Sequence, residues 1–281
     1  MSLIVGLWGE DKSCKTSLAL SFPKPMVFME MDIGGFRRAC RNLPHLPIKD
    51  WYDQKLIRYE AYPLPMTFGK FDPTKLELKP SKMIVGMKEL FYQWAAKYVA
   101  HLQDPKVATI VIDTATILKT VTDDAYLQEL QERQLPINPH TGMGSDGKPL
   151  RTQLLQIEYK EPNNRTRGIY YNAKSHGKYL VLVHHARDEY KPLPQKDGTI
   201  AMSPTGKRER AGFSTLGDSA DLIAHCFWQE AKKDRQGNIL EPGKPFCKIE
   251  LAEVKELEGM VIETPTYEKI QQVINMIRGE S

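Results

Sequence analysis

Residues 9–16 read Gly9-Glu10-Asp11-Lys12-Ser13-Cys14-Lys15-Thr16. The pattern G-x-x-x-x-G-K-S/T describes a phosphate-binding loop, and this stretch matches it everywhere except at Cys14, where the second glycine is expected. An apolar run over residues 3–8 predicts a buried strand before the loop, and residues 16–22 predict a helix after it. Main-chain N–H groups at such a helix N-terminus bind phosphate. The sequence therefore predicts a nucleoside triphosphate site at residues 9–17, which includes Ser17.

Two lysines and a threonine give this loop its expected chemistry. Lys15 would reach the β- and γ-phosphates, the Thr16 hydroxyl would ligate Mg²⁺, and Lys12 adds a second positive charge. A Cβ atom at Cys14 crowds the loop if that position needs a positive φ, although cysteine is small enough for the loop to close around phosphate. Two other interpretations stay open. The loop could bind nucleotide and hydrolyse it slowly, or the match could be fortuitous.

The composition is that of a soluble globular protein, with 281 residues, 41% hydrophobic and 26% charged. No apolar run approaches the roughly 18 residues that span a membrane, and the N-terminus lacks the features of a signal peptide. The four cysteines show no metal-binding or redox spacing, so reduced thiols in a cytoplasm are expected. The net charge of +4 permits a nucleic-acid partner without requiring one.

Strands and helices are expected to alternate along the chain, which predicts an α/β fold with a mostly parallel sheet covered on both faces. We expect one domain over residues 1–281, with irregular insertions at about 43–80 and 135–150 and a loop over 186–216. The expected strands cover residues 3–8, 26–31, 56–62, 107–113, 179–184, 221–228 and 246–251, the last two as an antiparallel pair with a turn near Gly237. The expected helices cover residues 16–22, 36–42, 82–102, 115–134, 153–159, 165–175 and 264–277.

Four polar features fall at the ends of expected strands: the loop at 9–16, Asp32, Asp113 and His184. In parallel α/β sheets, ligands bind beyond the carboxyl ends of the strands. Asp113 ends an apolar strand and precedes Thr114, so it is a candidate to hold Mg²⁺ opposite Thr16. The alternative role for Asp113 is that of a helix N-cap.

The catalytic base is expected among the carboxylates that follow residues 26–31. Strand alternation would point Glu30 and Asp32 to the same side, and Asp32 is the preferred base because it is closer to the turn. The alternative is a solvated strand end. His184 and His185 close another strand, and one of them could sense the γ-phosphate while the other packs inside.

The densest basic cluster of the chain is Lys207-Arg208-Glu209-Arg210. Its basic residues Lys207, Arg208 and Arg210 could contact DNA phosphates. They could also supply an arginine finger to a neighbouring subunit. A solvated surface loop is the third interpretation.

Taken together, these motifs resemble those of the phage-encoded RecA-like P-loop ATPases, a group that includes the Sak-type proteins associated with single-strand annealing. The resemblance rests on residues 9–19, the Phe-Pro-Lys-Pro break at 22–25, and Glu-Met-Asp-Ile-Gly-Gly at 30–35. It extends to Val-Ile-Asp-Thr at 111–114, Leu-Val-His-His-Ala-Arg-Asp-Glu-Tyr at 182–190 and Ala-Asp-Leu-Ile-Ala at 220–224. Cys14 departs from the group's loop, and a histidine stands where RecA itself has a sensor glutamine.

The resemblance implies a RecA-like core, ATP with Mg²⁺, assembly into a ring or filament, and action on single-stranded DNA in phage recombination or replication. It assigns the base to Asp32, the sensor to His184 or His185, DNA contacts to Lys207–Arg210, and an intersubunit role to Lys248. Two other classes remain. One is a nucleotide-type small-molecule kinase that uses residues 135–150 as a lid. The other is a non-catalytic nucleotide-binding assembly protein.

Overall fold

The computed structural model describes residues 3–42, 46–65, 70–72, 74, 77–79, 82–138, 141–194, 200–234 and 236–279. A nine-stranded sheet runs through it in the order β13-β12-β9-β1-β7-β6-β2-β3, with β8 paired to β7. The strands β3 to β9 of this path are parallel, and β12 is antiparallel to both of its neighbours, β9 and β13. The structure confirms the predicted α/β fold with a mostly parallel sheet, including the antiparallel strands at the C-terminal edge.

Continuous apolar runs produce the central strands, because both faces of a parallel sheet are buried. All six residues of β1 and all five of β2 and β6 are buried. The sheet strands are β1 (Ile4–Gly9), β2 (Met26–Glu30), β3 (Ile57–Ala61), β6 (Thr109–Asp113), β7 (Tyr179–Pro194), β8 (Ile200–Arg210), β9 (Leu222–Gln229), β12 (Lys244–Ala252) and β13 (Val261–Glu263).

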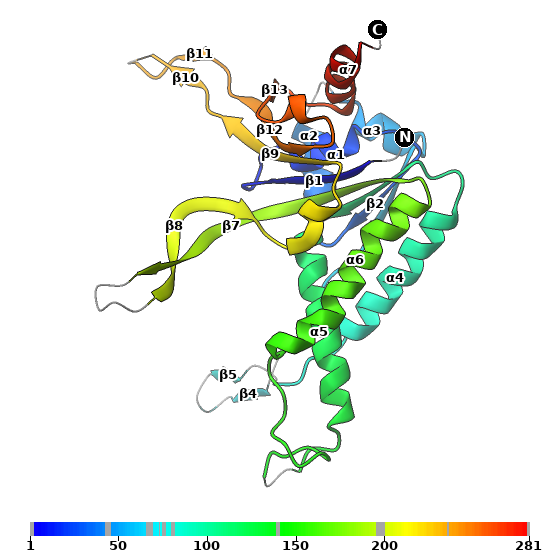
Figure 1. Cartoon of the computed structure of the whole chain (residues 1–281), viewed down its shortest axis with the longest axis vertical. Helices are drawn as coiled ribbons and strands as arrows, with labels where there is room; N and C mark the ends of the chain where they lie inside the picture. Colours follow the sequence, from blue (N-terminus) through cyan, green and yellow to red (C-terminus); the bar gives the residue numbers. More distant parts are fainter. Residues whose placement is uncertain are drawn as a thin grey trace.

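Helices cover both faces of the sheet (Figure 1). Alternate residues of β1 divide between two apolar cores: Val5 and Leu7 belong to one and Ile4 to the other. The first core also includes residues of α1 (Lys15–Leu20), α2 (Gly35–Asn42), α3 (Ile48–Asp53) and α7 (Tyr267–Arg278). The second includes residues of α4 (Met87–Gln103), α5 (Ala115–Arg133) and α6 (Lys160–Ser175).

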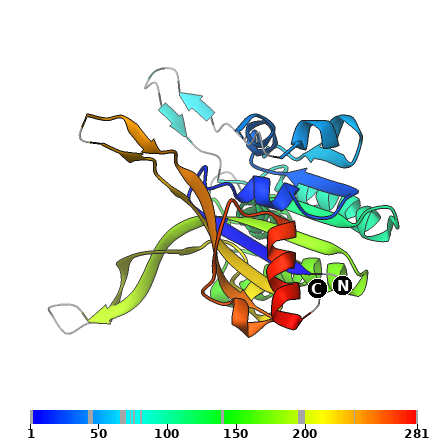
Figure 2. The same ribbon diagram turned by 90° about the horizontal axis from the view of Figure 1, so that it is seen from above.

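The prediction of a loop over residues 186–216 is wrong for most of this segment. The strand β7 continues beyond the sheet to Pro194 and pairs antiparallel with β8, before the short helix η2 (Ser214–Asp218). The two strands form a ribbon that extends away from the body of the molecule (Figure 2). A two-stranded ribbon exposed to solvent needs no apolar alternation, so its charged sequence carried no strand signal.

The remaining differences are local. The pair β10 (Lys232–Lys233) and β11 (Ile239–Glu241) extends the connection between β9 and β12. The helix predicted at 153–159 is only the 3₁₀ turn η1 (Gln156–Tyr159). Helix α6 begins five residues earlier than expected, and Pro162 lies in its first turn, where proline is tolerated. A further 3₁₀ turn, η3 (Lys255–Leu257), precedes β13.

The two predicted insertions are described in part. Residues 43–80 contain α3 and β3, followed by the small pair β4 (Lys70–Asp72) and β5 (Glu77–Lys79), whereas residues 43–45, 66–69, 73, 75–76 and 80 lie outside the described residues. Within 135–150, where 139–140 are outside them, the described residues form no helix and one isolated bridge, Met143 to Pro149. None of the helices in the described ranges is long and apolar enough to cross a membrane.

Candidate functional site

The loop at residues 9–16 joins β1 to α1 in the way the motif requires. Gly9 has φ +151°, and a Cβ atom there would lie 2.0 Å from the carbonyl oxygen of Cys226, so only glycine fits. Cys14 is the N-cap residue of α1 and has φ 65° and ψ 13°. Cys14 therefore has the positive φ that would crowd the loop with a Cβ atom, so cysteine occupies a conformation that favours glycine.

Lys15 lies inside the loop with only 8% of its surface exposed. Its Nζ atom donates to the carbonyl oxygens of Gly9 at 2.9 Å and Glu10 at 2.6 Å, and to the Ser13 hydroxyl at 3.3 Å. Burial lowers the pKa of Lys15, and neighbouring acidic groups oppose this shift. The ammonium group is held where phosphate oxygens could replace these acceptors.

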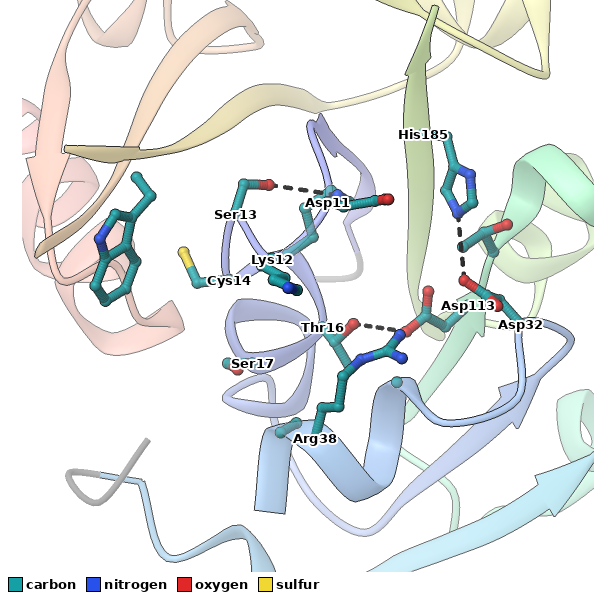
Figure 3. Close-up of a pocket in the computed structure, with 15 residues that line it drawn as sticks. Asp11, Lys12, Ser13, Cys14, Thr16, Ser17, Asp32, Arg38, Asp113 and His185 are labelled. Atoms are coloured by element: carbon teal, nitrogen blue, oxygen red, sulfur yellow. Dashed lines mark hydrogen bonds and ion pairs between the residues drawn. The ribbon is translucent and has the colours of Figure 1, made fainter. Parts of the chain in front are cut away.

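Thr16 and Asp113, which are 97 positions apart in the chain, meet at the end of the parallel strands. The Thr16 hydroxyl donates to Asp113 Oδ2 at 2.7 Å, and Figure 3 shows the two side chains directed at one another. Burial raises the pKa of Asp113 to about 6, and the hydrogen bond from Thr16 opposes this shift. The two residues predicted to share Mg²⁺ are therefore in contact.

A third oxygen converges on the same point. A Cβ atom built on Gly35 would lie 3.0 Å from Asp113 Oδ2, 3.1 Å from Glu30 Oε1 and 3.6 Å from Thr16 Oγ1. Such an oxygen set fits Mg²⁺, which takes one or two protein ligands and completes its shell with water and phosphate oxygens. Within the described part of the chain, no group of three or more His, Cys, Asp or Glu side chains could hold a metal ion. The oxygens of Thr16 and Asp113 are therefore candidate ligands for a magnesium ion whose other ligands come from water or phosphate.

Glu30 and Asp32 have different surroundings, and β2 ends at Glu30, so strand alternation does not extend to Asp32. Glu30 is 1% exposed and accepts hydrogen bonds from the main-chain N–H of Phe36 at 2.8 Å and the hydroxyl of Tyr59 at 2.7 Å. Burial and the Glu30 carboxylate raise the pKa of Tyr59 to about 12. Asp32 is partly exposed and lies 3.6 Å from His185 Nε2 (Figure 3). Glu30 is thus buried beside the Thr16–Asp113 pair, whereas Asp32 lines the cavity next to the loop.

The two histidines have different environments. His184 is fully buried, with Nδ1 2.8 Å from the carbonyl oxygen of Ala211 and its ring against Phe213. Its Nε2 atom has no hydrogen-bond partner among the described residues. His185 lines the cavity beside the loop. Of the pair, His184 is the packed residue and His185 faces the site.

Acid should destabilise the protein through His184. Burial lowers the pKa of His184 to about 3, against an ordinary value of 6.5. Below pH 6.5, His184 therefore binds a proton in the unfolded state but not in the folded state. The free energy of unfolding falls as the pH drops from 6.5 towards 3. The expected loss between pH 7 and pH 5 is about 2 kcal/mol. Urea unfolding at pH 7 and pH 5 measures this loss of stability. A His184→Phe variant that loses as much stability between the two pH values as the unchanged protein would contradict the role of His184.

A cavity of about 750 Å³ opens beside the loop, a size suited to a small-molecule ligand. Its lining includes predicted residues from Asp11 to Ser17, Asp32, Asp113 and His185 (Figure 3). It also includes Gly35 and Thr114, which belong to the quoted motifs but had no assigned site role, and three residues that the sequence did not indicate: Arg38, Ala39 and Trp228. Trp228 is half-exposed near the end of β9, and aromatic rings of this kind stack on nucleobases. Its position at the end of a parallel strand was the signal that could have identified it.

The predicted basic residues have different surroundings. Arg208 contacts the loop itself, because its Nε donates to Glu10 at 2.7 Å and one of its terminal nitrogens donates to Asp188 at 2.6 Å. Arg210 donates to the carbonyl oxygen of Phe213 at 2.8 Å. Lys207 is exposed on the β8 ribbon, and Lys248 is exposed on β12, opposite His225.

The four cysteines are free thiols. Burial raises the pKa of Cys14 to about 12, so the residue that replaces the loop glycine stays a neutral thiol. It adds no negative charge to a loop that is predicted to bind phosphate.

No protein-family model matches the chain, and no curated protein matches its sequence. Among solved structures, the chain is similar to a KaiC-like protein from the hyperthermophilic archaeon Pyrococcus horikoshii OT3. The two are 11% identical, with a TM-score of 0.45, and the match covers 93% of this chain and 84% of the other. At this distance the likeness carries no conclusion about activity, which has to be inferred from the geometry of the site.

Proposed function

We propose that the protein binds ATP with Mg²⁺ and hydrolyses it. The observation that carries this proposal is the hydrogen bond between Thr16 and Asp113, because it joins the two halves of a magnesium–triphosphate site across the sheet. Gly9, the positive φ of Cys14 and the enclosed ammonium group of Lys15 support it. The bound Mg²⁺ would neutralise charge on the β- and γ-phosphates.

Each side chain of the site has a proposed role. Lys15 leaves the carbonyl oxygens of its own loop and binds the β- and γ-phosphates. Thr16 and Asp113 hold the metal ion. Glu30 takes the proton of the attacking water, because it is the buried carboxylate beside that pair, and Asp32 is the alternative base. His185, in contact with Asp32, responds to the γ-phosphate.

We propose that the ribbon of β7 and β8 changes position when nucleotide binds at the site. Arg208 bridges Glu10 of the loop to Asp188 of β7, so a nucleotide-dependent shift of the loop reaches the ribbon through one side chain. We propose that the ribbon, with Lys207, holds single-stranded DNA, and that copies of the chain assemble into a ring or filament in which Lys248 or Arg208 reaches a neighbouring site. Recombination or replication in a phage-infected cell is the setting this proposal implies.

One experiment tests the function as a whole. ATP turnover is measured with and without an oligo(dT) strand, and the particle size is measured with and without ATP. We expect turnover that depends on Mg²⁺ and rises several-fold with the strand, and a larger particle with ATP. ATP binding without any turnover, with or without the strand, would instead identify a non-catalytic assembly protein. Phosphate transfer to a nucleoside monophosphate would identify a kinase.

A further inference from the structure

A second cavity, of about 570 Å³, lies beside the first. Helix α2 contributes to both: Gly35, Arg38 and Ala39 line the first cavity, whereas Phe36, Arg37, Cys40 and Arg41 line the second. The other walls of the second cavity come from the turn before α2, from α3 and from β3. Its volume falls within the range of small-molecule sites.

The second cavity carries positive charge that the described residues do not neutralise. Arg37 and Arg41 are exposed one helical turn apart, and like charges at this spacing destabilise a helix. No ion pair within the described ranges involves either of them. Lys49 has only a long contact to Asp53, at 3.7 Å, with both side chains well exposed, and such pairs contribute little. Arg37 and Arg41 therefore face this cavity without an ion pair among the described residues, and Lys49 adds a third positive charge with only a weak, exposed pair.

Aromatic side chains form another wall. Tyr52 is 45% exposed and meets the buried Phe36 edge-on, with ring centroids 5.4 Å apart. Phe36 in turn stacks on Tyr59 at 5.0 Å. The inner rings hold Tyr52 in place while part of its surface stays open to a ligand. A ring surface next to guanidinium groups suits a ligand that joins an aromatic ring to a phosphate.

The one acidic group in the lining does not oppose such a ligand directly. Glu30 lies on the buried side, and its two oxygens already accept from the Phe36 N–H and the Tyr59 hydroxyl. The arginines are exposed, so a phosphate bound by them stays at the outer side of the cavity.

We propose that this second cavity binds a nucleotide unit, with its phosphate on Arg37 and Arg41 and its base on Tyr52. The unit is either a free nucleotide or one residue of a single strand, since both present the same phosphate and ring. The proposal does not depend on ATP binding at the loop. Tyr59 and Glu30, which line this cavity, place the bound unit next to the proposed reaction centre.

The test uses the full chain with Lys15→Ala, which removes the loop as a binding site. Fluorescently labelled AMP and a labelled dT₁₂ strand are titrated into this protein and into three derivatives. The first adds R37A and R41A, the second adds Y52A, and the third adds K106A and R133A, which removes two exposed positive charges from other surfaces. The side chains changed in the three derivatives are exposed, so their thermal unfolding should differ little from that of the Lys15→Ala chain.

The double arginine variant should bind at least one probe about tenfold more weakly than the control variant, and Y52A should weaken the same probe several-fold. Loss of AMP binding alone identifies a free nucleotide, and loss of dT₁₂ binding identifies a strand. Equal affinity of the arginine and control variants for both probes, or no binding of either probe, overturns the proposal. If instead the chain with Lys15 intact fails to bind ATP while the arginines still matter, the loop proposal fails and this one stands.

Discussion

Replacing Lys15 with alanine should abolish ATP turnover and weaken ATP binding by about 100-fold or more. The ammonium group is the buried positive charge of the loop, and its three acceptors mark where phosphate oxygens would lie. Charge-assisted hydrogen bonds to phosphate in a buried site contribute about 1.5–3 kcal/mol each, and two of them account for the expected loss of affinity. Removing a group that stabilises developing charge costs a further 10²–10³-fold in rate, roughly.

Lys12 provides the matched control, because it lies in the same loop but is exposed. Lys12→Ala removes the same charge and should change affinity only a few-fold. Affinity is measured by titration with a fluorescent ATP analogue, and folding by thermal unfolding without nucleotide, since Lys15→Ala leaves two loop carbonyls without their donor. ATP should raise the melting temperature of the Lys12 variant but not that of the Lys15 variant. Equal ATP affinity in the two variants would show that the loop is not the nucleotide site.

The parallel core could be predicted because its signal is local. A strand buried on both faces is a continuous apolar run, and residues 3–8, 26–31 and 107–113 are such runs. Each ends at a polar residue or turn that the topology places at one edge. The proximity of Thr16 to Asp113 followed from that rule, and the distance of 2.7 Å agrees with it.

The β7–β8 ribbon could not be predicted, because its strands are stabilised by pairing with each other and not by burial. Residues 187–191 and 207–210 are mostly charged, so their sequence is that of a surface loop. The bridge from Arg208 to Glu10 joins residues 198 positions apart, and no local pattern encodes such a contact. The sequence therefore identified Arg208 as a candidate residue without indicating its neighbours.

The choice between Glu30 and Asp32 also lay beyond the sequence. Alternation applies only while the strand lasts, and β2 stops at Glu30. The hydrogen bonds that fix Glu30 come from Phe36, after the turn, and from Tyr59 on the neighbouring strand. The environment of a carboxylate depends on such distant donors, so the sequence alone could not describe the surroundings of Glu30 or Asp32.

Glu30→Gln should lower the turnover number about 10²–10³-fold with little change in ATP affinity, whereas Asp32→Asn should lower it less than about threefold. Both substitutions keep the size of the side chain and remove its ability to accept a proton. Glu30 Oε1 lies among the oxygens around Gly35, but Asp32 is partly exposed and in contact with His185. A base must lie within hydrogen-bond reach of the water it activates. Of the two carboxylates, Asp32 lines the first cavity, whereas Glu30 is buried beside the Thr16–Asp113 pair, and we assign the base to Glu30 because of that position.

The comparison requires that the glutamine variant fold normally. Glutamine keeps one carbonyl oxygen to accept from the Phe36 N–H, and its amide can donate to the Tyr59 hydroxyl, which then acts as the acceptor. A lower rate combined with an unchanged melting temperature and ATP affinity therefore reports chemistry, since ground-state binding is preserved. The opposite result, a large loss in Asp32→Asn and a small one in Glu30→Gln, would assign the base to Asp32 and leave Glu30 to position Phe36 and Tyr59. His185→Ala separates the two cases further, because it removes the contact of Asp32 while leaving every hydrogen bond of Glu30 in place.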